Sequence, residues 1–580
     1  MSKVARASLD DLPNEVIVRI LLYSDFRSIL CYATTGRRGY NLVKSSATLQ
    51  LQIELEVAGL EIVDSASDAT TPCLLQDLKR YRDAWVDMKF GPAIEVPMPK
   101  DRILLWELRE GSFISAYSTI HGRKLADAIQ VIPLGSQELP KPIKIDFTFH
   151  EFTIDLSQKL VVLAVIDSSP QDHVRILFRS SETGLSHPLA QQPLILALLG
   201  FPILHKDTSS ITLEIMDDIL VAKFADIKSL SYEILIWNWK TTTLLNRISS
   251  RTGVCDLGLL DRQNLILYHA APSYRSTALR AVSLRVYQNF LSPSENRNAD
   301  HDTYMFASND YSSLDYTFSF IFPEIHPSVS ILPPALALRS DPIPGRLVHK
   351  TGSTKLASIR NGVLGLTFPL SYNPNLQPQD VTYRIFVSTS RLFDLIKNHP
   401  ETTTFEWNTW GEHTTRWFSD DNQQADWISW LSGSRYLRSS PGVSYGSLTL
   451  TMVDFCPFSV KRHSEPHSNQ IVPPTQPLKG RNANMEHRWT RTLRDWWNSR
   501  PDWTSSDERV FVDVVGSKIP TIVEVGLRYP VISRLGWRSV TLARPFPVKV
   551  WLIEGEHLIG KDFRGFGART NQMTVCKLQT

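Results

Sequence analysis

Apolar and polar residues alternate with a period of two along most of this chain after about residue 90, a pattern that is typical of β-strands. Phe152 and Ile154 alternate with polar residues, a turn follows at residues 157–159, and an apolar run begins at Leu160. This spacing predicts two antiparallel strands joined by a short turn. The alternation therefore predicts a body that is built mainly of β-sheet.

The strand–turn–strand unit recurs, and a third strand follows each copy. Related units cover residues 211–224, 254–269 and 355–368. The last unit turns at Asn361-Gly362, a dipeptide that favours hairpins and predicts that its flanking strands pair. Sets of three meandering strands in units of about 40 to 60 residues are typical of β-propeller blades. Two stacked β-sandwiches would give similar alternation, so that architecture stays an alternative.

Two of the predicted strands end in tryptophan followed by polar residues, at Trp106 and at Trp237. These endings resemble those of WD-type blades, and the resemblance implies a WD-type β-propeller. The last strand pattern, residues 548–553, would leave an open sheet edge if the β body stopped there. We therefore expect it to join the sheet that contains residues 103–108, so that the two ends of the β region meet.

The first 90 residues follow a helical period instead. Pro13 suits the start of a helix, where its missing N–H is not needed, and Glu15 then lies in the first turn near the positive end of the helix dipole. Asp25 is placed to cap a second helix, and Ser45 or Ser46 to cap a later one. Short helices of this kind cannot close a core alone. Their excess apolar surface must be covered either by a partner or, as a helical cap, by the following domain.

The segment 12–59 resembles the F-box, the adaptor-binding motif of substrate receptors in SCF-type ubiquitin ligases. The matching positions are Leu12, Pro13, Glu15, Val16, Ile20, Leu21, Asp25, Ile29, Leu30, Arg38, Ser45, Ser46, Leu49 and Gln50. The tail at residues 54–59 and the helix pattern at 74–88 resemble F-box proteins of mushroom-type fungi in particular. The chain departs from the family at Gly36 and Gly39, which weaken a helix by about 1 kcal/mol each relative to alanine.

The resemblance implies a non-enzymatic receptor. Its N-terminal helices would bind the ligase adaptor and, through it, a cullin, while the β body would bind an unknown substrate protein. The adaptor-binding residues that it implies are Leu12, Pro13, Glu15, Val16, Ile20, Leu21, Ile29 and Leu30. The alternative is a non-catalytic propeller scaffold in which the F-box is degenerate.

These patterns predict an α+β multidomain chain. We expect a helical F-box domain at residues 1–60, a linker helix at 61–95 and a mainly β, propeller-like domain at 96–580. A basic segment rich in Pro and Trp, at about residues 461–505, interrupts the β pattern. Its mixture of basic and aromatic residues can bind single-stranded nucleic acid. We favour a long excursion between two blades, with the nucleic-acid interpretation as the alternative.

Other features set limits on the function. The net charge of +3 gives no overall field for nucleic acid or membranes, and the longest apolar run, residues 193–204, is shorter than the ~20 residues that span a bilayer. Five isolated cysteines and no apolar leader favour a cytoplasmic or nuclear protein. Cys456, His463 and His467 lack the four-ligand pattern of a zinc site, so no metal or other cofactor is expected. The chain carries no P-loop, HExxH or GxSxG motif.

Overall fold

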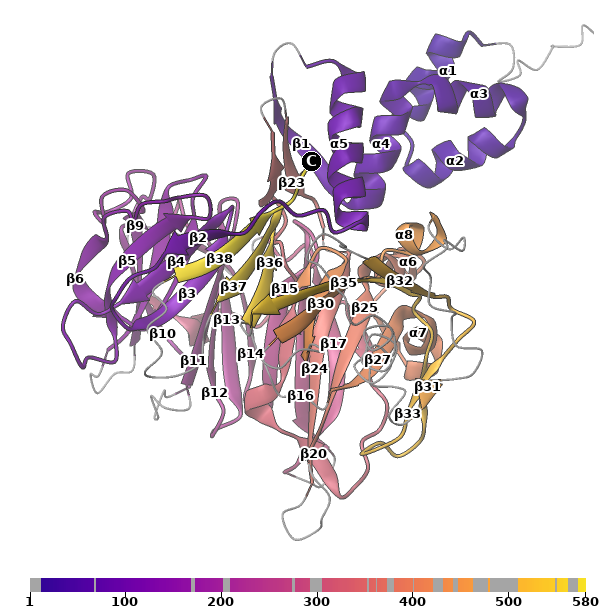
Figure 1. Ribbon diagram of the computed structural model, residues 1–580. Helices are drawn as coiled ribbons and strands as arrows, with labels where there is room; N and C mark the ends of the chain where they lie inside the picture. The colour runs from indigo at the N-terminus through magenta and orange to yellow at the C-terminus, as the bar shows by residue number, and fades with distance from the viewer. Residues whose placement is uncertain are drawn as a thin grey trace, which may run out of the picture.

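The computed structural model describes most of the chain as a mainly β body with a helical region at its N-terminal end (Figure 1). The described residues are 12–66, 69–167, 173–201, 209–273, 277–292, 305–351, 354–360, 362–372, 380–399, 401–420, 431–441, 447–462, 478–479, 510–547, 550–561 and 572–580. Nearly all of the basic segment lies outside these ranges. So do His463 and His467, two of the three residues considered above as metal ligands.

Four helices open the described chain, as the apolar spacing predicts. They are α1 (Asn14–Leu21), α2 (Phe26–Thr34), α3 (Arg37–Ser45) and α4 (Ala47–Ala58). Asp25 caps α2 by accepting a hydrogen bond from the backbone N–H of Ser28 at 2.8 Å, and Ser46 caps α4. Both predicted caps are therefore confirmed. Pro13 lies one position earlier than predicted, at the N-cap of α1.

Gly39 has a packing role within this helical region. A Cβ atom at this position would lie 2.5 Å from the backbone oxygen of Tyr32, so the glycine lets α3 approach α2 closely. Its cost in helix propensity is therefore offset by close packing between the two helices. The four helices pack around a small core of buried apolar side chains, formed by Ile17, Leu21, Phe26, Ile29, Leu42, Val43, Leu49 and Ile53.

Seven sheets make up most of the β body, and we number them in chain order. Sheet 1 contains β3 (Ile103–Arg109), β4 (Ser112–Tyr117), β5 (Ala126–Pro133) and β6 (Ile143–Phe149). Sheet 2 contains β7 (Glu151–Asp155), β8 (Leu160–Ile166), β9 (His173–Ser180), β10 (Leu194–Leu198) and β18 (Met305–Ala307). Sheet 3 contains β11 (Ser209–Met216), β12 (Ile219–Asp226), β13 (Ser231–Asn238) and β14 (Thr243–Ser250). The hairpin predicted at residues 157–159 and the one predicted within the unit 211–224 are confirmed.

Later sheets include shorter strands and helical excursions. Sheet 4 contains β15 (Val254–Leu259), β16 (Asn264–Pro272), β17 (Leu279–Gln288), β19 (Phe318–Ile321) and β26 (Thr403–Phe405). Sheet 5 contains β20 (Val329–Ile331), β21 (Ala337–Arg339), β24 (Val363–Tyr372), β25 (Val381–Ser388) and β27 (Thr415–Asp420). Sheet 6 contains β28 (Leu431–Ser432), β29 (Arg435–Pro441), β30 (Ser447–Asp454), β35 (Trp537–Pro547) and β32 (Val510–Val515). Three further helices are α6 (Thr389–Lys397), α7 (Trp407–Thr414) and α8 (Pro457–Arg462).

The basic segment at 461–505 lies in the chain between β30 and β32, which both belong to sheet 6. The predicted excursion between two blades is therefore wrong in its placement. A small sheet accompanies this connection, formed by β31 (Leu478–Lys479), β33 (Thr521–Val523) and β34 (Val531–Ser533).

The predicted hairpin at Asn361-Gly362 is also wrong. The strand before it, β23 (Thr354–Ser358), pairs with β1 (Leu60–Ser65) and with β22 (Leu347–Lys350), whereas β24 after it belongs to sheet 5. Residues 363–370 of β24 are buried and pair with β25, and residues 365–367 also pair with β21 on the other edge. Pairing within the two sheets therefore outweighs the local turn preference of the dipeptide.

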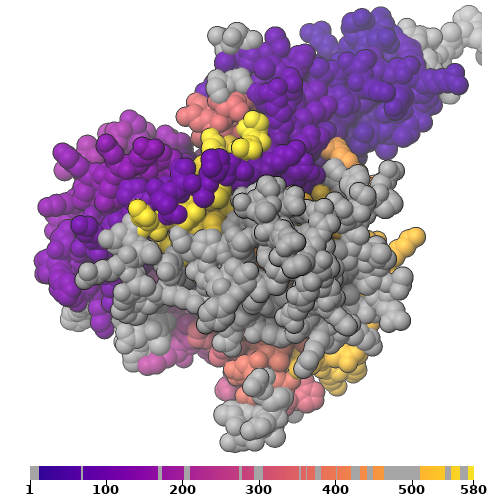
Figure 2. All heavy atoms as spheres, viewed as in Figure 1, coloured from indigo at the N-terminus to yellow at the C-terminus, as the bar shows by residue number. Residues whose placement is uncertain are grey.

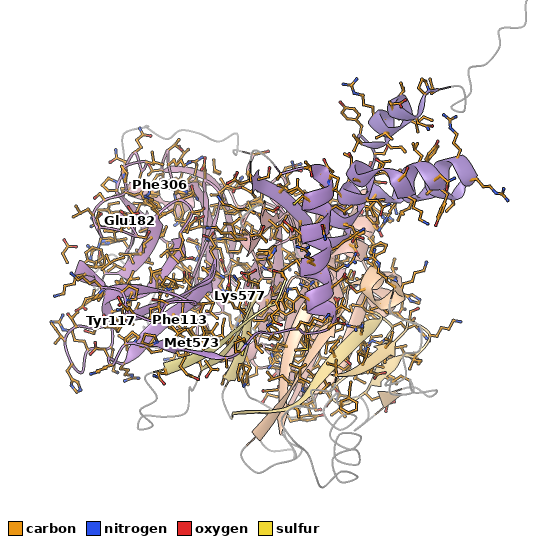
Figure 3. All side chains as sticks on the ribbon, turned by 45° about the horizontal axis from the view of Figure 1, so that its top comes forward. Phe113, Tyr117, Glu182, Phe306, Met573 and Lys577 are labelled. Atoms are coloured by element: carbon orange, nitrogen blue, oxygen red, sulfur yellow. The ribbon has the colours of Figure 1, made fainter. Side chains whose placement is uncertain are left out.

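Sheet 7 joins the two ends of the β region. It contains β36 (Val550–Glu554), β37 (His557–Lys561), β38 (Gln572–Lys577) and, from the N-terminal side, β2 (Ile94–Pro97). The predicted meeting of the two ends is confirmed by the pairing of β2 with β38. The predicted partner is wrong, because the last strands pack on sheet 1 instead of joining it. Phe113 of sheet 1 and Met573 of sheet 7 share one apolar cluster at this contact (Figure 3).

Apolar clusters fill the contact between each sheet and the next. Such clusters join sheets 1 and 2, 2 and 3, 3 and 4, 4 and 5, 5 and 6, 6 and 7, and finally 7 and 1. The series of contacts therefore returns to its starting sheet.

The helical region is attached through α4, β1 and α5 (Thr71–Val86). Leu78, Tyr81 and Trp85 of α5 are buried in the cluster that also joins sheets 6 and 7. Helices α1 and α3 lie at the outer end of the helical region, away from the β body (Figures 1 and 2). The segment predicted as a linker helix thus contains both α5 and the strand β1.

Candidate protein-docking surface

The first helix carries apolar side chains on two sides. Ile17 and Leu21 are buried in the helical core, whereas Val16 and Ile20 are 40% and 45% exposed. Positions 16 and 20 are four residues apart, so their side chains lie next to each other on one helix face. An isolated surface helix normally places polar residues there.

Exposed apolar side chains continue along the next two helices. The whole set, which we call the helical apolar surface, comprises Val16, Ile20, Leu22, Tyr23, Leu30 and Tyr40. It accounts for six of the 17 large exposed apolar side chains in the described part of the chain, although it spans only 25 positions. Tyr23 is 93% exposed in the turn after α1. Apolar exposure concentrated in one part of a chain is typical of surfaces that bind another molecule.

The eight predicted adaptor-binding residues divide into two groups. Pro13, Glu15, Val16, Ile20 and Leu30 are exposed, and Leu12 is partly buried. Leu21 and Ile29 are buried in the helical core beneath the exposed side chains, and their contact with an adaptor stays a prediction. The sequence alone could not show which of these residues are buried. A helix that is apolar on two sides does not indicate which side faces the core.

Arg38 holds the start of α1 in place. Its guanidinium donates hydrogen bonds to the backbone oxygen of Leu12 at 2.6 Å and to Oδ1 of Asn14 at 2.9 Å. These bonds tie the Leu-Pro segment to α3. Arg38, which matches the F-box pattern, therefore orders the start of α1. It is not one of the exposed apolar residues of the helical apolar surface.

Ion pairs fix the helical region on the β body. Arg27 of α2 forms a bidentate pair with Asp394 of α6, with distances of 2.8 and 3.1 Å. The Glu54 carboxylate accepts from Arg82 at 2.8 Å and from Arg462 at 3.3 Å.

The backbone N–H of Ser28 lowers the pKa of Asp25 below its ordinary value, which keeps the cap of α2 ionised.

The described residues also bear on metal binding and on membrane crossing. Among them, no three His, Cys, Asp or Glu side chains are grouped in a way that would hold a metal ion. None of the helices in the described part of the chain combines the length and apolar character that a membrane span requires.

Comparison with known proteins gives no assignment. No protein-family model and no curated protein matches the chain. Among solved structures, hydrazine synthase of Kuenenia stuttgartiensis is 9% identical, with 62% of this chain and 77% of that chain covered at a TM-score of 0.28. The WD40 domain of SCAP from fission yeast is 12% identical, with 62% and 71% covered at a TM-score of 0.21. These scores are too low to assign a shared fold.

Proposed function

We propose that this protein is the substrate receptor of an SCF-type ubiquitin ligase. The observation that carries the proposal is the helical apolar surface, which lies on the segment that resembles an F-box and projects from the β body. In this role Val16 and Ile20 bury against the adaptor, which completes the small helical core on its exposed side. A cullin binds through the adaptor, and the protein performs no chemistry of its own.

We further propose that sheets 1 to 7 are the blades of a WD-type β-propeller that binds the substrate protein. The support is the order of the sheets along the chain, the apolar contact of each with the next, and the return of these contacts from sheet 7 to sheet 1. The receptor then acts by proximity, since it holds a substrate lysine near the ubiquitin-loaded enzyme. This role places the protein in the cytoplasm or nucleus.

The test is capture of the adaptor by the purified full chain. The double variant Val16→Asp, Ile20→Asp should weaken capture by about 30-fold or more, because apolar anchors at the centre of an interface commonly contribute 2 kcal/mol or more. Both side chains are exposed, so the variant should fold as the natural chain does.

Val63→Asp is the matched control, since Val63 is 57% exposed on β1 and lies outside the helical apolar surface. It should capture the adaptor normally. A natural chain that does not bind the adaptor at micromolar concentration would refute the receptor role and leave the scaffold alternative.

A further inference from the structure

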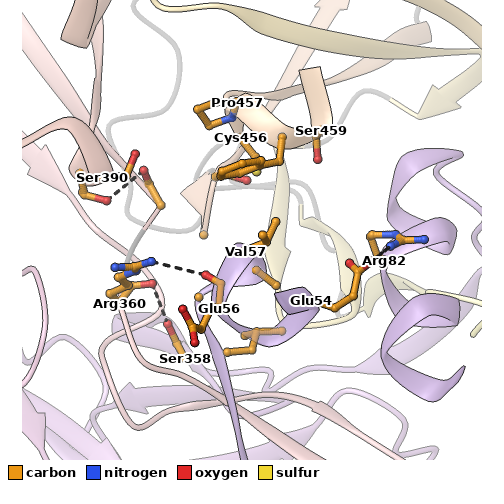
Figure 4. Close-up of a pocket in the computed structure, with 18 of the residues that line it drawn as sticks. Glu54, Glu56, Val57, Arg82, Ser358, Arg360, Ser390, Cys456, Pro457 and Ser459 are labelled. Carbon is orange, nitrogen blue, oxygen red and sulfur yellow. Dashed lines mark hydrogen bonds and ion pairs between the residues drawn. The ribbon is translucent and has the colours of Figure 1, made fainter. Parts of the chain in front are cut away.

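A cavity of about 290 Å³ lies between the helical region and the β body. The helical side of its wall comes from the start of α2, the end of α4 and one face of α5. The other side comes from Ser358, Arg360 and Gly362, from α6, and from the segments 432–435 and 454–459 (Figure 4). Its volume is close to the lower limit of known small-molecule sites, which are about 300 to 1,000 Å³.

The carboxylates in the wall are already satisfied. Asp394 and Glu54 form the ion pairs with arginines given above. Glu56 accepts hydrogen bonds from the backbone N–H of Phe26 at 2.9 Å and from the side chain of Gln52 at 3.0 Å. Asp454 accepts from the Ser434 hydroxyl at 2.6 Å. These acids therefore have little capacity left for a cationic ligand.

Two arginines in the wall have no carboxylate partner in the part of the chain that the structure describes. Within the described residues, the guanidinium of Arg360 donates one long hydrogen bond, at 3.4 Å, to the backbone oxygen of Glu56. Arg435 lies over the ring of Trp85 at 5.0 Å and near Tyr81, with no acidic partner in that part of the chain. Both side chains are partly buried, and a partly desolvated guanidinium is stabilised by an anion that accepts two parallel hydrogen bonds.

The rest of the wall supplies hydroxyls and apolar surface. Ser358 and Ser390 lie on the same side as Arg360 in the close-up view (Figure 4). Val57, Phe393 and Phe458 add apolar contact. We propose that this cavity binds a small organic anion, a carboxylate or phosphate monoester with a compact apolar body, through Arg360 and Arg435.

Such a ligand touches the helical region and the β body at once. Binding therefore stabilises their contact, by an amount that grows with ligand concentration relative to Kd. The site is independent of the proposed receptor function, because none of its residues belongs to the helical apolar surface.

The experiment measures binding of two probes, benzoate and phenyl phosphate, to the full chain by calorimetry and thermal shift. At least one should bind and raise the melting temperature, and the tighter probe shows whether the natural ligand is a carboxylate or a phosphate. Arg360→Gln should weaken binding by about tenfold or more, since a hydrogen bond to a charged group contributes about 1.5 to 3 kcal/mol. Arg435→Gln should act in the same direction.

Three controls make the result specific. Arg123→Gln removes an exposed arginine outside the cavity and should leave binding unchanged. Arg360→Lys keeps the charge and should retain part of the affinity. Benzyl alcohol, which lacks the anion, should bind much more weakly. The proposal is overturned if neither anion binds at about 10 mM, if benzyl alcohol binds equally well, or if Arg123→Gln weakens binding as much as Arg360→Gln.

Discussion

Buried arginine and acidic side chains lie where sheets 1, 2, 3 and 7 meet. Arg109 on β3 contacts Glu214 at 3.3 Å and Asp341 at 3.1 Å, and Arg346 contacts Glu110 at 3.4 Å. Further acids in this group are Glu107, Glu151, Asp155 and Glu554. The acids outnumber the two arginines, so some of them are more stable in the protonated form. Burial raises the pKa of Glu151 and Glu554 to about 8 and that of Glu214 to about 7.

These raised pKa values predict that stability falls as the pH rises from about 4.5 to about 8. Glu554 has a pKa of about 8 in the folded chain and an ordinary value of 4.5, so the folded state holds the extra proton between these values. Its contribution is fully present below pH 4.5 and is lost as the pH rises through about 8. Glu554→Gln should remove that loss, because the amide stays neutral and its oxygen can still accept the 3.0 Å hydrogen bond from the backbone N–H of Gly111.

Melting temperatures between pH 5 and pH 9 test this prediction. The variant should gain stability over the natural chain on the alkaline side of the range. Glu138→Gln, at an exposed position, should follow the natural chain throughout. A natural chain and Glu554→Gln variant with parallel curves would contradict the raised pKa. Neighbouring His557 acts in the opposite sense, since burial lowers its pKa to about 4 and its contribution is lost on acidification.

At the scale of elements, α5 is the main connection between the helical region and the β body. Its Leu78, Tyr81 and Trp85 side chains are buried together with strands of sheets 6 and 7. Tyr81 stacks on His349 with a centroid distance of 4.4 Å, and the indole of Trp85 lies beneath Arg435. Helix α5 and the β body therefore share one core.

Trp85→Ala should destabilise the whole chain by about 3 to 5 kcal/mol, since it removes a large side chain that is 1% exposed and leaves a cavity. Denaturant unfolding of the full chain measures the effect, and the transition should shift for the β body as well as the helices. Tyr529→Ala, at a site 65% exposed, should change the midpoint little. If only the helical signal moved, α5 would not be part of the shared core.

For the whole molecule, the pairing of β2 with β38 brings the two ends of the β region together. Val96 of β2 and Met573 of β38 are opposite each other in this pairing and are both fully buried. The contact of sheet 7 with sheet 1 depends on the same strands. Residues near the two ends of the β region therefore stabilise one another although they are distant in sequence.

Deletion of residues 572–580 should lower the melting temperature of the complete protein and promote aggregation, because β37 then has an unpaired edge and the apolar face of sheet 1 loses its cover. Thermal scans and light scattering check both effects. A shorter deletion, of Thr580 alone, should have neither effect, as this residue is exposed. A chain without β38 that melted like the natural one would show that the closing sheet adds no stability.

The sequence by itself determined the elements whose stability is local. The cap at Asp25, the cap at Ser46 and the hairpin at residues 157–159 depend on neighbours a few positions away, and each was predictable. The change from helical to strand periodicity near residue 90 likewise located the start of the β body, which begins at Ile94.

Only the tertiary structure decided which segments meet. The two strands around Asn361-Gly362 separate because distant partners, β1 and β25, offer more pairing and burial than the turn does. Leu21 and Ile29 are buried because the other helices cover their side. Val16 and Ile20 are also apolar but lie on a side that stays exposed. Arg360 and Arg435, which have no carboxylate partner among the described residues, likewise become neighbours of one cavity through contacts between the helical region and the β body. Long-range packing has no local signal, since its free energy depends on surfaces that come together only in the folded chain.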